Sequence, residues 1–334
     1  MTALIHSQNP HFNGLRPINP MRDLPGVANL IEHAFAHELD SSGQSALEEL
    51  RWLGRFKPLL WWMLFFQFER TDYLSGFVWE DEKVIIGNVT LNPMGNSNRR
   101  WLISNVAVAK SYRKQGIARQ LMQASIEQVR NQQGAYILLQ VRADNTQAKK
   151  LYQALQFQEV CGTTYLQVNR VPEVNVAPLP HGLTLRHRRF NGQDTHALYR
   201  LVTTMTPEAV QHEWPVRQHQ FEVSLEERFK NFWRGLVALA PAYWFIEDGS
   251  KLVAAIQIQP SYFNEPNRIE LIVHPKWWGQ LEDSLISLAL DYLIPTQNRP
   301  TLAKHPTYHE AAITTYCHFG FVEEQTLCWM KRTM

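Results

Sequence analysis

The segment 101–160 contains residue types and spacings that can bind an anion. An apolar stretch leads into the basic turn 113–116, and an amphipathic pattern begins directly after it. Gly116 would let the backbone approach a ligand closely. A helix that starts near Ile117 would add its free N–H groups and the positive end of its dipole, and Arg119 would add charge. This is the chemistry of a pyrophosphate site; the alternative is an ordinary turn with solvated basic residues.

The elements that would position this turn follow from apolar periodicity. Helical spacing occurs at Leu24–Glu38, Ser45–Phe56, Ile117–Asn131 and Thr146–Leu155. Strand patterns occur at Asp72–Trp79, Val84–Leu91, Trp101–Val108, Ala135–Val141 and Gln158–Val168, and the polar turn 80–82 between the first two indicates a hairpin. This order predicts an α/β fold with a mixed (α+β) sheet and helices on both faces.

An internal repeat with an offset of about 165–170 residues predicts two copies of this arrangement. The matches, all in the same order, are Leu15-Arg16 with Leu185-Arg186, Trp79-Glu80-Asp81 with Ile246-Glu247-Asp248, Asn92-Pro93 with Gln259-Pro260, and Ala148, Tyr152 and Phe157 with Ala312, Tyr316 and Phe321. A proline-rich stretch, 171–182, separates the copies and is typical of a stiff linker. The predicted domains are therefore residues 13–170 and 183–334.

Composition limits the function classes. The chain has 334 residues, which suits two domains, and a formal net charge of +2, which gives no argument for a nucleic-acid partner. Its three cysteines show no CxxC or metal-ligand spacing, so we expect reduced thiols, no metal and a cytoplasmic location. The N-terminus lacks the pattern of a signal peptide. The apolar run 58–68 is shorter than the roughly 20 residues that span a bilayer; we expect a buried segment, a substrate wall or a dimer contact.

Two motifs in this segment resemble those of the GNAT superfamily of acyl-CoA N-acyltransferases. The turn Arg113-Lys114-Gln115-Gly116-Ile117-Ala118 matches the family's Q/R-x-x-G-x-G/A pattern. The stretch from Asn145 through Ala148, Leu151 and Tyr152 to Phe157 matches N-x-x-A-x-x-L-Y-x-x-x-G-F, with Gln156 in place of the glycine. That glycine serves a helix C-terminus, so the departure affects turn geometry more than chemistry.

The resemblance implies acetyl-CoA as co-substrate, a strand segment that pairs with its pantetheine arm and a turn that holds its pyrophosphate. The residues implied for cofactor binding are Val106, Ala107, Val108, Arg113, Lys114, Gln115, Gly116, Ile117, Ala118, Arg119 and Asn145. Asn145 would bond to the cofactor, cap its helix, or do both.

Tyr152 is the implied catalytic residue, because a phenol near the thioester can protonate the departing thiolate. The alternative is an aromatic ring that only packs beneath the cofactor. Many relatives carry a glutamate as general base where this chain has Ser104 and Asn105. The sequence leaves several candidates for the base: Glu69, Asp72, Glu80, Glu159, a residue acting through water, or none if the amine arrives deprotonated.

The second copy has lost most of the anion-binding pattern. Its turn reads His274-Pro-Lys-Trp-Trp-Gly279-Gln-Leu-Glu282, which keeps a glycine but places acidic side chains near the anion position. His309 replaces Asn145. We therefore expect a degenerate GNAT-like domain that binds coenzyme A poorly because the negative charges repel it.

Together these features predict an acetyl-CoA-dependent N-acetyltransferase in which a primary amine attacks the thioester directly. The alternatives are a non-catalytic acyl-CoA-binding or regulatory protein and a purely structural interaction protein. The acceptor is a small molecule or a peptide, and the sequence identifies neither it nor the oligomeric state. No nucleic-acid partner and no membrane span are expected.

Overall fold

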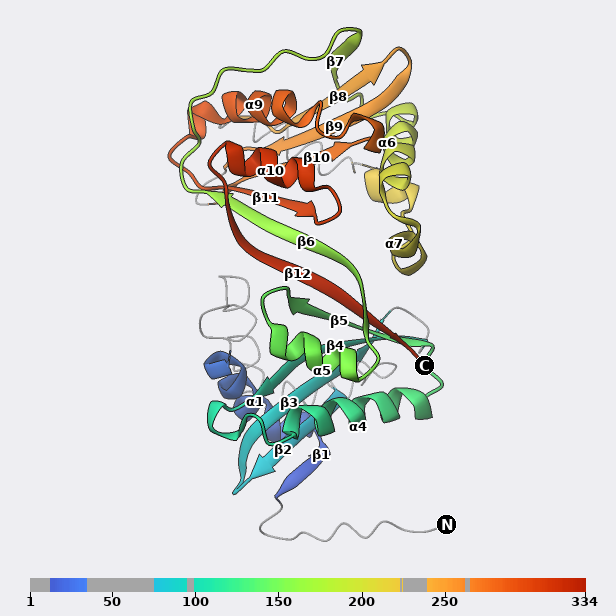
Figure 1. The fold of residues 1–334 in the computed structure, drawn as a ribbon, viewed down its shortest axis with the longest axis vertical. Helices are drawn as coiled ribbons and strands as arrows, with labels where there is room; N and C mark the ends of the chain where they lie inside the picture. Colours follow the sequence, from blue (N-terminus) through green and yellow to red (C-terminus); the bar gives the residue numbers. More distant parts are fainter. Residues whose placement is uncertain (1–12, 35–74, 95–98, 223, 225–238, 262–264) are drawn as a thin grey trace. The chain divides into compact units, whose positions relative to one another are not determined.

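The computed structural model describes residues 13–34, 75–94, 99–222, 224, 239–261 and 265–334, which form two compact units (Figure 1). The predicted helix Ser45–Phe56, the apolar run 58–68 and the candidate bases Glu69 and Asp72 lie outside the described residues. Within the described ranges, no helix combines the length and apolar character needed to cross a membrane.

Unit 1 comprises described residues within 13–141, 146–159 and 329–334. Its elements are β1 (Gly14–Pro17), α1 (Pro20–Ala34), β2 (Ser75–Asp81), β3 (Val84–Pro93), β4 (Arg100–Val108), α4 (Ile117–Asn131), β5 (Tyr136–Arg142) and α5 (Thr146–Ala154). Strands β1 to β4 pair antiparallel in sequence order, and β5 pairs parallel with β4. Helix α4 has the predicted bounds, whereas α1 starts four residues earlier than predicted because the Asn19 side chain accepts the Met21 N–H at 3.1 Å.

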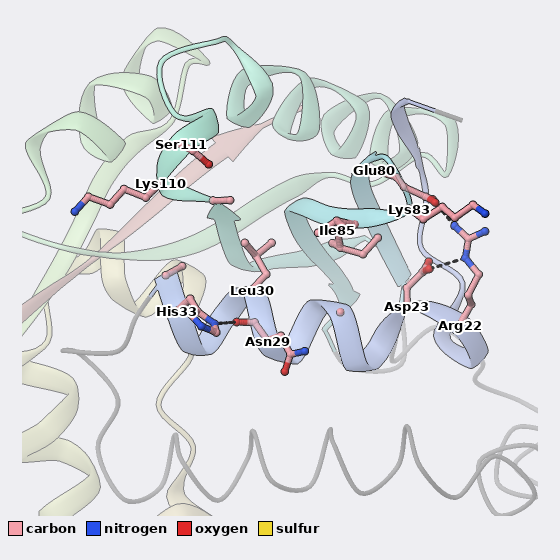
Figure 2. A pocket seen from close by; sticks show the side chains of 14 residues that line it. Arg22, Asp23, Asn29, Leu30, His33, Glu80, Lys83, Ile85, Lys110 and Ser111 are labelled. Carbon is pink, nitrogen blue, oxygen red and sulfur yellow. Dashed lines mark hydrogen bonds and ion pairs between the residues drawn. The ribbon is translucent and has the colours of Figure 1, made fainter. Parts of the chain in front are cut away.

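Apolar faces fix the helices of unit 1 on the sheet. Helix α1 packs on β3 and β4, and α4 packs on β2, β3 and β4, from opposite sides of the sheet (Figure 2). Gly26 of α1 lies against Ile85, and Gly87 of β3 lies against Ile117 and Leu121 of α4. The absence of a side chain at Gly87 therefore lets α4 pack closely against β3.

Unit 2 holds described residues within 142–145 and 160–328. Its elements are β6 (Gln158–Val168), β7 (Leu183–His187), α6 (Gly192–Met205), α7 (Glu208–Glu213), β8 (Ala242–Asp248), β9 (Lys251–Gln259), β10 (Asn267–Val273), α9 (Glu282–Leu293), β11 (Thr301–Pro306), α10 (Glu310–His318) and most of β12 (Val322–Thr333). Leu271, Leu285, Ile286 and Tyr316 belong to its hydrophobic core. Strands β7 to β10 and β11 repeat the order of β1 to β5.

An ion cluster recurs at equivalent positions in both units. In unit 1, Arg16 of β1 bonds to Asp23 at 2.6 Å and to Glu80 at 2.7 Å. In unit 2, Arg186 of β7 bonds to Asp194 and to Glu247, both at 2.7 Å. The arginines and the glutamates are residues that the sequence repeat aligned, and each glutamate follows a register shift in its hairpin. The shared geometry supports the repeat.

The terminal strands of the two copies are exchanged. Strand β6 is the last strand of the first copy in sequence but pairs with β11 of unit 2. Residues 329–334, at the end of the second copy, belong to unit 1, where the Met334 N–H donates to the Ala135 carbonyl at 2.9 Å. The contact-based units therefore differ from the sequence-based bounds 13–170 and 183–334, which we retain as a proposal about the repeated copies. The linker 171–182 lies within unit 2.

Candidate functional site

Strands β4 and β5 separate at the level where a cofactor arm is expected. Their parallel pairing runs from Arg100 opposite Tyr136 to Ile103 opposite Leu139, although β4 continues to Val108 and β5 to Arg142. The Ala109 N–H donates to Ile86 on the β3 side at 2.8 Å, so strand alternation directs the backbone groups of Val108 and Val106 toward the gap. Ala107, between them, is buried and pairs with Asn88. The gap thus has backbone groups of β4 along one edge that do not pair with β5.

The basic turn lies at the mouth of this gap. The Arg113 guanidinium donates from Nε to the Val108 carbonyl at 3.2 Å, which ties the turn to the end of β4. Lys114 has a φ of +64° and Gly116 a φ of +82°, so the backbone curls in the left-handed region twice before α4 begins. A concave run of backbone of this kind directs N–H groups toward one point.

Gly116 is the N-cap of α4, and its position is open. No side chain caps the helix, and a Cβ at Gly116 would meet no atom within 4 Å. The first N–H groups of a helix have no partners inside it, so those of Ile117, Ala118 and Arg119 remain available. Arg119 is exposed, as are Lys114 and Gln115, whereas the Ile117 side chain is buried and offers only its backbone. The arrangement fits the pyrophosphate of coenzyme A on the structure's own geometry.

Tyr152 lies on α5, the helix after β5. Its side chain is 6% exposed, and its ring packs against Phe157 with centroids 6.1 Å apart. Burial raises the pKa of the Tyr152 phenol to about 12, so the hydroxyl is protonated throughout the neutral range. Its hydroxyl makes no hydrogen bond with the described residues of β4 or the turn. Asn145, exposed, directly precedes α5 and donates its N–H to the Arg142 carbonyl at 3.1 Å.

Neither candidate base within the described residues is a free carboxylate. Glu80 is 6% exposed and is bonded by the guanidinium groups of both Arg16 and Arg22. Glu159 forms an ion pair with Lys149 at 2.9 Å. A pocket of about 1250 Å³ is lined by residues of α1, of the β2–β3 turn and of 109–111. Figure 2 shows that its two carboxylates, Asp23 and Glu80, both face Arg22. Its carboxylates therefore serve the ion cluster of unit 1.

The equivalent cleft of unit 2 is occupied by the chain's own side chains. The indole N–H of Trp278 donates to the Val273 carbonyl at the end of β10 at 2.9 Å. The corresponding acceptor in unit 1 is the Val108 carbonyl at the end of β4, to which the Arg113 guanidinium donates. The Glu282 carboxylate accepts the Leu281 N–H at 3.1 Å and so places a carboxylate at the N-terminus of α9. Trp278 also stacks on His309 with centroids 4.4 Å apart. A ligand phosphate would meet a carboxylate and an indole here.

A buried hydrogen-bonded chain holds this closure. Glu282 bonds to His309 at 2.6 Å, and His309 bonds to His305 at 2.7 Å; all three are at most 1% exposed. His305 lies in β11 and His309 is the N-cap residue of α10, so the two share no helix face. In the described ranges, no set of three or more histidine, cysteine or acidic side chains is arranged to hold a metal ion.

The chain resembles known acetyltransferases. Residues 32–157 match the model of the Acetyltransferase (GNAT) family. A 58-residue stretch is 40% identical to N-alpha-acetyltransferase 30 of Schizosaccharomyces pombe (strain 972 / ATCC 24843) and covers 17% of this chain and 39% of that relative, so the match spans well under half of its length.

Solved structures match nearly the whole chain in fold. A GCN5-related N-acetyltransferase from Sphaerobacter thermophilus has a TM-score of 0.61 at 14% identity, covering 96% of this chain and 95% of that one. A tandem GNAT protein from the clavulanic acid biosynthesis pathway has a TM-score of 0.51 at 14% identity, covering 96% and 98%. At such identities the likeness concerns the fold, which is that of two tandem GNAT-like domains.

Proposed function

Because the chain is a member of the GNAT superfamily, we propose that it is an acetyl-CoA-dependent N-acetyltransferase whose first domain binds the cofactor. One observation supports this most: α4 begins at an uncapped, left-handed glycine that faces open space, directly beside the gap between β4 and β5. In the other domain the N-cap residue of α9 is Leu281, whose N–H is bonded by the Glu282 carboxylate, and Trp278 bonds to the end of β10. We infer one cofactor site for each chain.

Different residues of unit 1 would bind different parts of the cofactor. The N–H groups that start α4, with Lys114 and Arg119, would hold the pyrophosphate, and the backbone of Val106 and Val108 would pair with the pantetheine arm. Arg113 would both fix the turn and contribute charge. Asn145, at the start of α5, remains a proposed cofactor contact.

Acetyl-CoA supplies a thioester whose carbonyl carbon accepts the amine. The amine nitrogen forms a bond to that carbon, the carbon–sulfur bond breaks, and the thiolate takes the proton of the Tyr152 hydroxyl. Glu80 and Glu159 are engaged in ion pairs, so the proton lost by the nitrogen passes to water or to one of the other two candidates, Glu69 and Asp72. Solvent then restores the proton of Tyr152.

The acceptor remains a primary amine, either a small molecule or a peptide N-terminus. A peptide N-terminus is supported by the activity named for the curated relative, which matches only 58 residues.

A cytoplasmic location is supported by three cysteines, Cys161, Cys317 and Cys328, that form no disulfide.

Thiol release from acetyl-CoA in the presence of amines tests this function. The panel should contain polyamines, amino acids, amino sugars and peptides with free N-termini. We expect amine-dependent thiol release with at least one class. Tight coenzyme A binding without turnover on the whole panel would instead support a non-catalytic acyl-CoA-binding protein. If coenzyme A does not raise the melting temperature, a structural interaction protein is the better account, because a ligand of the folded state must stabilise it.

A further inference from the structure

The end of β4 carries one more residue than the strand opposite it. Ser104 to Val108 of β4 lie opposite Gly87 to Thr90 of β3, and the register shifts between Asn88 and Thr90. Asn105 has a φ of +51°, in the left-handed region. This is a β-bulge, which bends the strand that carries it. The bulge lies where the pairing of β4 with β5 has ended, at the start of the gap.

A buried amide is bonded to this bulge. Asn88 of β3 is fully buried, and its Nδ2 donates to the Asn105 carbonyl at 3.0 Å. The acceptor is a carbonyl oxygen, so the amide nitrogen must face it, which fixes the orientation of the side chain. Thr90 Oγ1 lies 3.4 Å from the amide nitrogens of both Asn88 and Asn105. The Asn88 side chain thus holds the backbone carbonyl of the bulged residue, Asn105.

The second domain shows the same strands without the amide. Counting from the aligned hairpins, Ala255 of β9 takes the place of Asn88. There Ala254 to Gln257 lie opposite Glu270 to Val273, residue for residue, with no register shift. The bulge and the asparagine are therefore present together in the domain with the open cleft and absent together from the domain whose cleft is filled.

The Asn88 side chain also keeps an unused acceptor. Its Oδ1 is buried and has no hydrogen-bond partner among the residues that the structure describes. A buried acceptor without a partner is unfavourable, so folded proteins keep such groups mainly where a water, an ion or a ligand supplies the partner. This indicates that Asn88 serves more than the packing of β3 against β4.

We propose that Asn88 is a positioning residue for acetyl transfer: it fixes the bulge at Asn105, and the bulge orients the backbone of Val106 to Val108 against the thioester arm. This inference rests on the proposed function. It predicts that loss of the Asn88 amide disturbs the orientation of the reacting group but not the anchoring of the pyrophosphate, which depends on the turn and on α4.

The test compares Asn88→Ala with Asn88→Asp in the full chain. Alanine is the residue that the second domain carries at this place, so the variant suits a folded strand pair, and aspartate keeps the shape but loses the donor. We expect kcat to fall about 10- to 100-fold in both variants, since small misplacements of reacting groups have effects of this size. The dissociation constant for coenzyme A should stay within about threefold. Thr90→Val, which keeps the Asn88 to Asn105 bond, is the control and should retain most of the activity.

A rescue separates positioning from general damage. Asn105→Gly favours the left-handed backbone of the bulge without help from Asn88. Combined with Asn88→Ala, it should recover at least about threefold in kcat. Hydrogen exchange supplies a readout that needs no activity: the amides of residues 104–108 should exchange at least about 10-fold faster in Asn88→Ala.

The outcomes are distinguishable. Inactivity of the unchanged protein with every amine, together with faster exchange in Asn88→Ala, would refute the acetyl transfer and still support the bond between Asn88 and the bulge. If an active protein keeps its kcat within twofold in Asn88→Ala, or if Asn105→Gly recovers nothing, the proposed role is overturned.

Discussion

Two glycines at equivalent turns make the binding account testable at single residues. Gly116 is the N-cap residue of α4, and Gly279 lies two residues before Leu281, the N-cap residue of α9. Their φ values are +82° and +76°, and no described residue beyond the chain neighbours has an atom within 4 Å of where a Cβ would lie. A side chain at either position therefore meets the same backbone strain. The two differ in what lies nearby: free helix N–H groups beside one, and the carboxylate of Glu282 in the turn of the other.

Gly116→Glu should weaken coenzyme A binding by at least about 100-fold, or about 2.7 kcal/mol, because it places a carboxylate at the anion position. Gly279→Glu is the matched control and should leave affinity within about threefold. Calorimetric titration of both variants measures this. Equal losses in the two variants would show that backbone strain, and not the anion site, explains the effect.

Tyr152 and Tyr316 form a second matched pair. Tyr152→Phe should lower kcat about 100-fold and leave the dissociation constant for coenzyme A nearly unchanged, because only the proton donor is removed. Tyr316→Phe should leave kcat unchanged, since that hydroxyl is buried without a partner in the second domain. Steady-state rates at saturating acetyl-CoA report both. Undiminished turnover in Tyr152→Phe would leave the ring with a packing role alone.

Helix ends illustrate what sequence patterns predict at the level of elements. Tyr152 and Phe157 end α5 as Tyr316 and Phe321 end α10, and in each case the phenylalanine N–H donates to the tyrosine carbonyl. The sequence indicated that Gln156 departs from glycine at this turn. The structure shows Gln156 with a φ of +66°, and Gly320 has +84° at the same place.

Gln156→Gly should therefore raise the free energy of unfolding by about 0.5–1 kcal/mol, because glycine accepts left-handed φ without strain. Gly320→Ala should lower the free energy of unfolding by about 1 kcal/mol, because alanine is strained at the left-handed φ of this position. No described atom lies close enough to add a clash to that strain. Urea unfolding measures both changes. Destabilisation by Gln156→Gly would mean that the glutamine side chain makes a contact worth more than the strain.

The buried histidines make the second domain sensitive to acid. Burial, and then the nearby charge of His309, lower the pKa of His305 to about 3, against about 6.5 in an unfolded chain. The unfolded chain thus binds a proton that the folded one does not, and stability falls as the pH drops below about 6.5. His305→Gln should reduce this fall between pH 7 and pH 5. The same substitution at exposed His181 is the control, and an identical pH profile in His305→Gln and the parent protein would refute this assignment.

Periodicity and motif spacing were sufficient for some features and insufficient for others. The bounds of α4 and β6 follow from a clean apolar pattern that ends at polar residues. The bulge at Asn105 does not follow from the sequence, because an extra residue in β4 leaves the apolar pattern of that strand intact. Asn88 belongs to no recognisable motif. Trp278 and Glu282 show in sequence that the second turn is altered, but only the contacts show that they fill it.

The strand exchange belongs to the whole molecule and has no sequence signal. Strands β6 and β12 occupy the same place in the two copies, so either fits either sheet by pattern alone. The contacts of residues 329–334 within unit 1 include the Met334 N–H to the Ala135 carbonyl, the Arg332 guanidinium to the Leu155 carbonyl at 2.5 Å, and Lys331 over the ring of Tyr136 at 4.7 Å. The first domain therefore depends on the end of the chain.

Removal of residues 329–334 should destabilise unit 1 by about 2–4 kcal/mol, from the loss of several hydrogen bonds and their strand pairing. Unit 2 keeps its core, so thermal unfolding should split into two transitions, of which only the lower responds to coenzyme A. Calorimetry with and without the ligand measures this. Removal of Met334 alone is the control, with a small expected effect. A single unshifted transition would show that the terminal strand contributes little.

The central claim is that one of two similar domains has kept its cofactor site. Titration of the full chain with acetyl-CoA tests it most directly, because the number of sites is read from the curve without any assumption about the acceptor. We predict one site for each chain. Two sites, or none, would contradict the account.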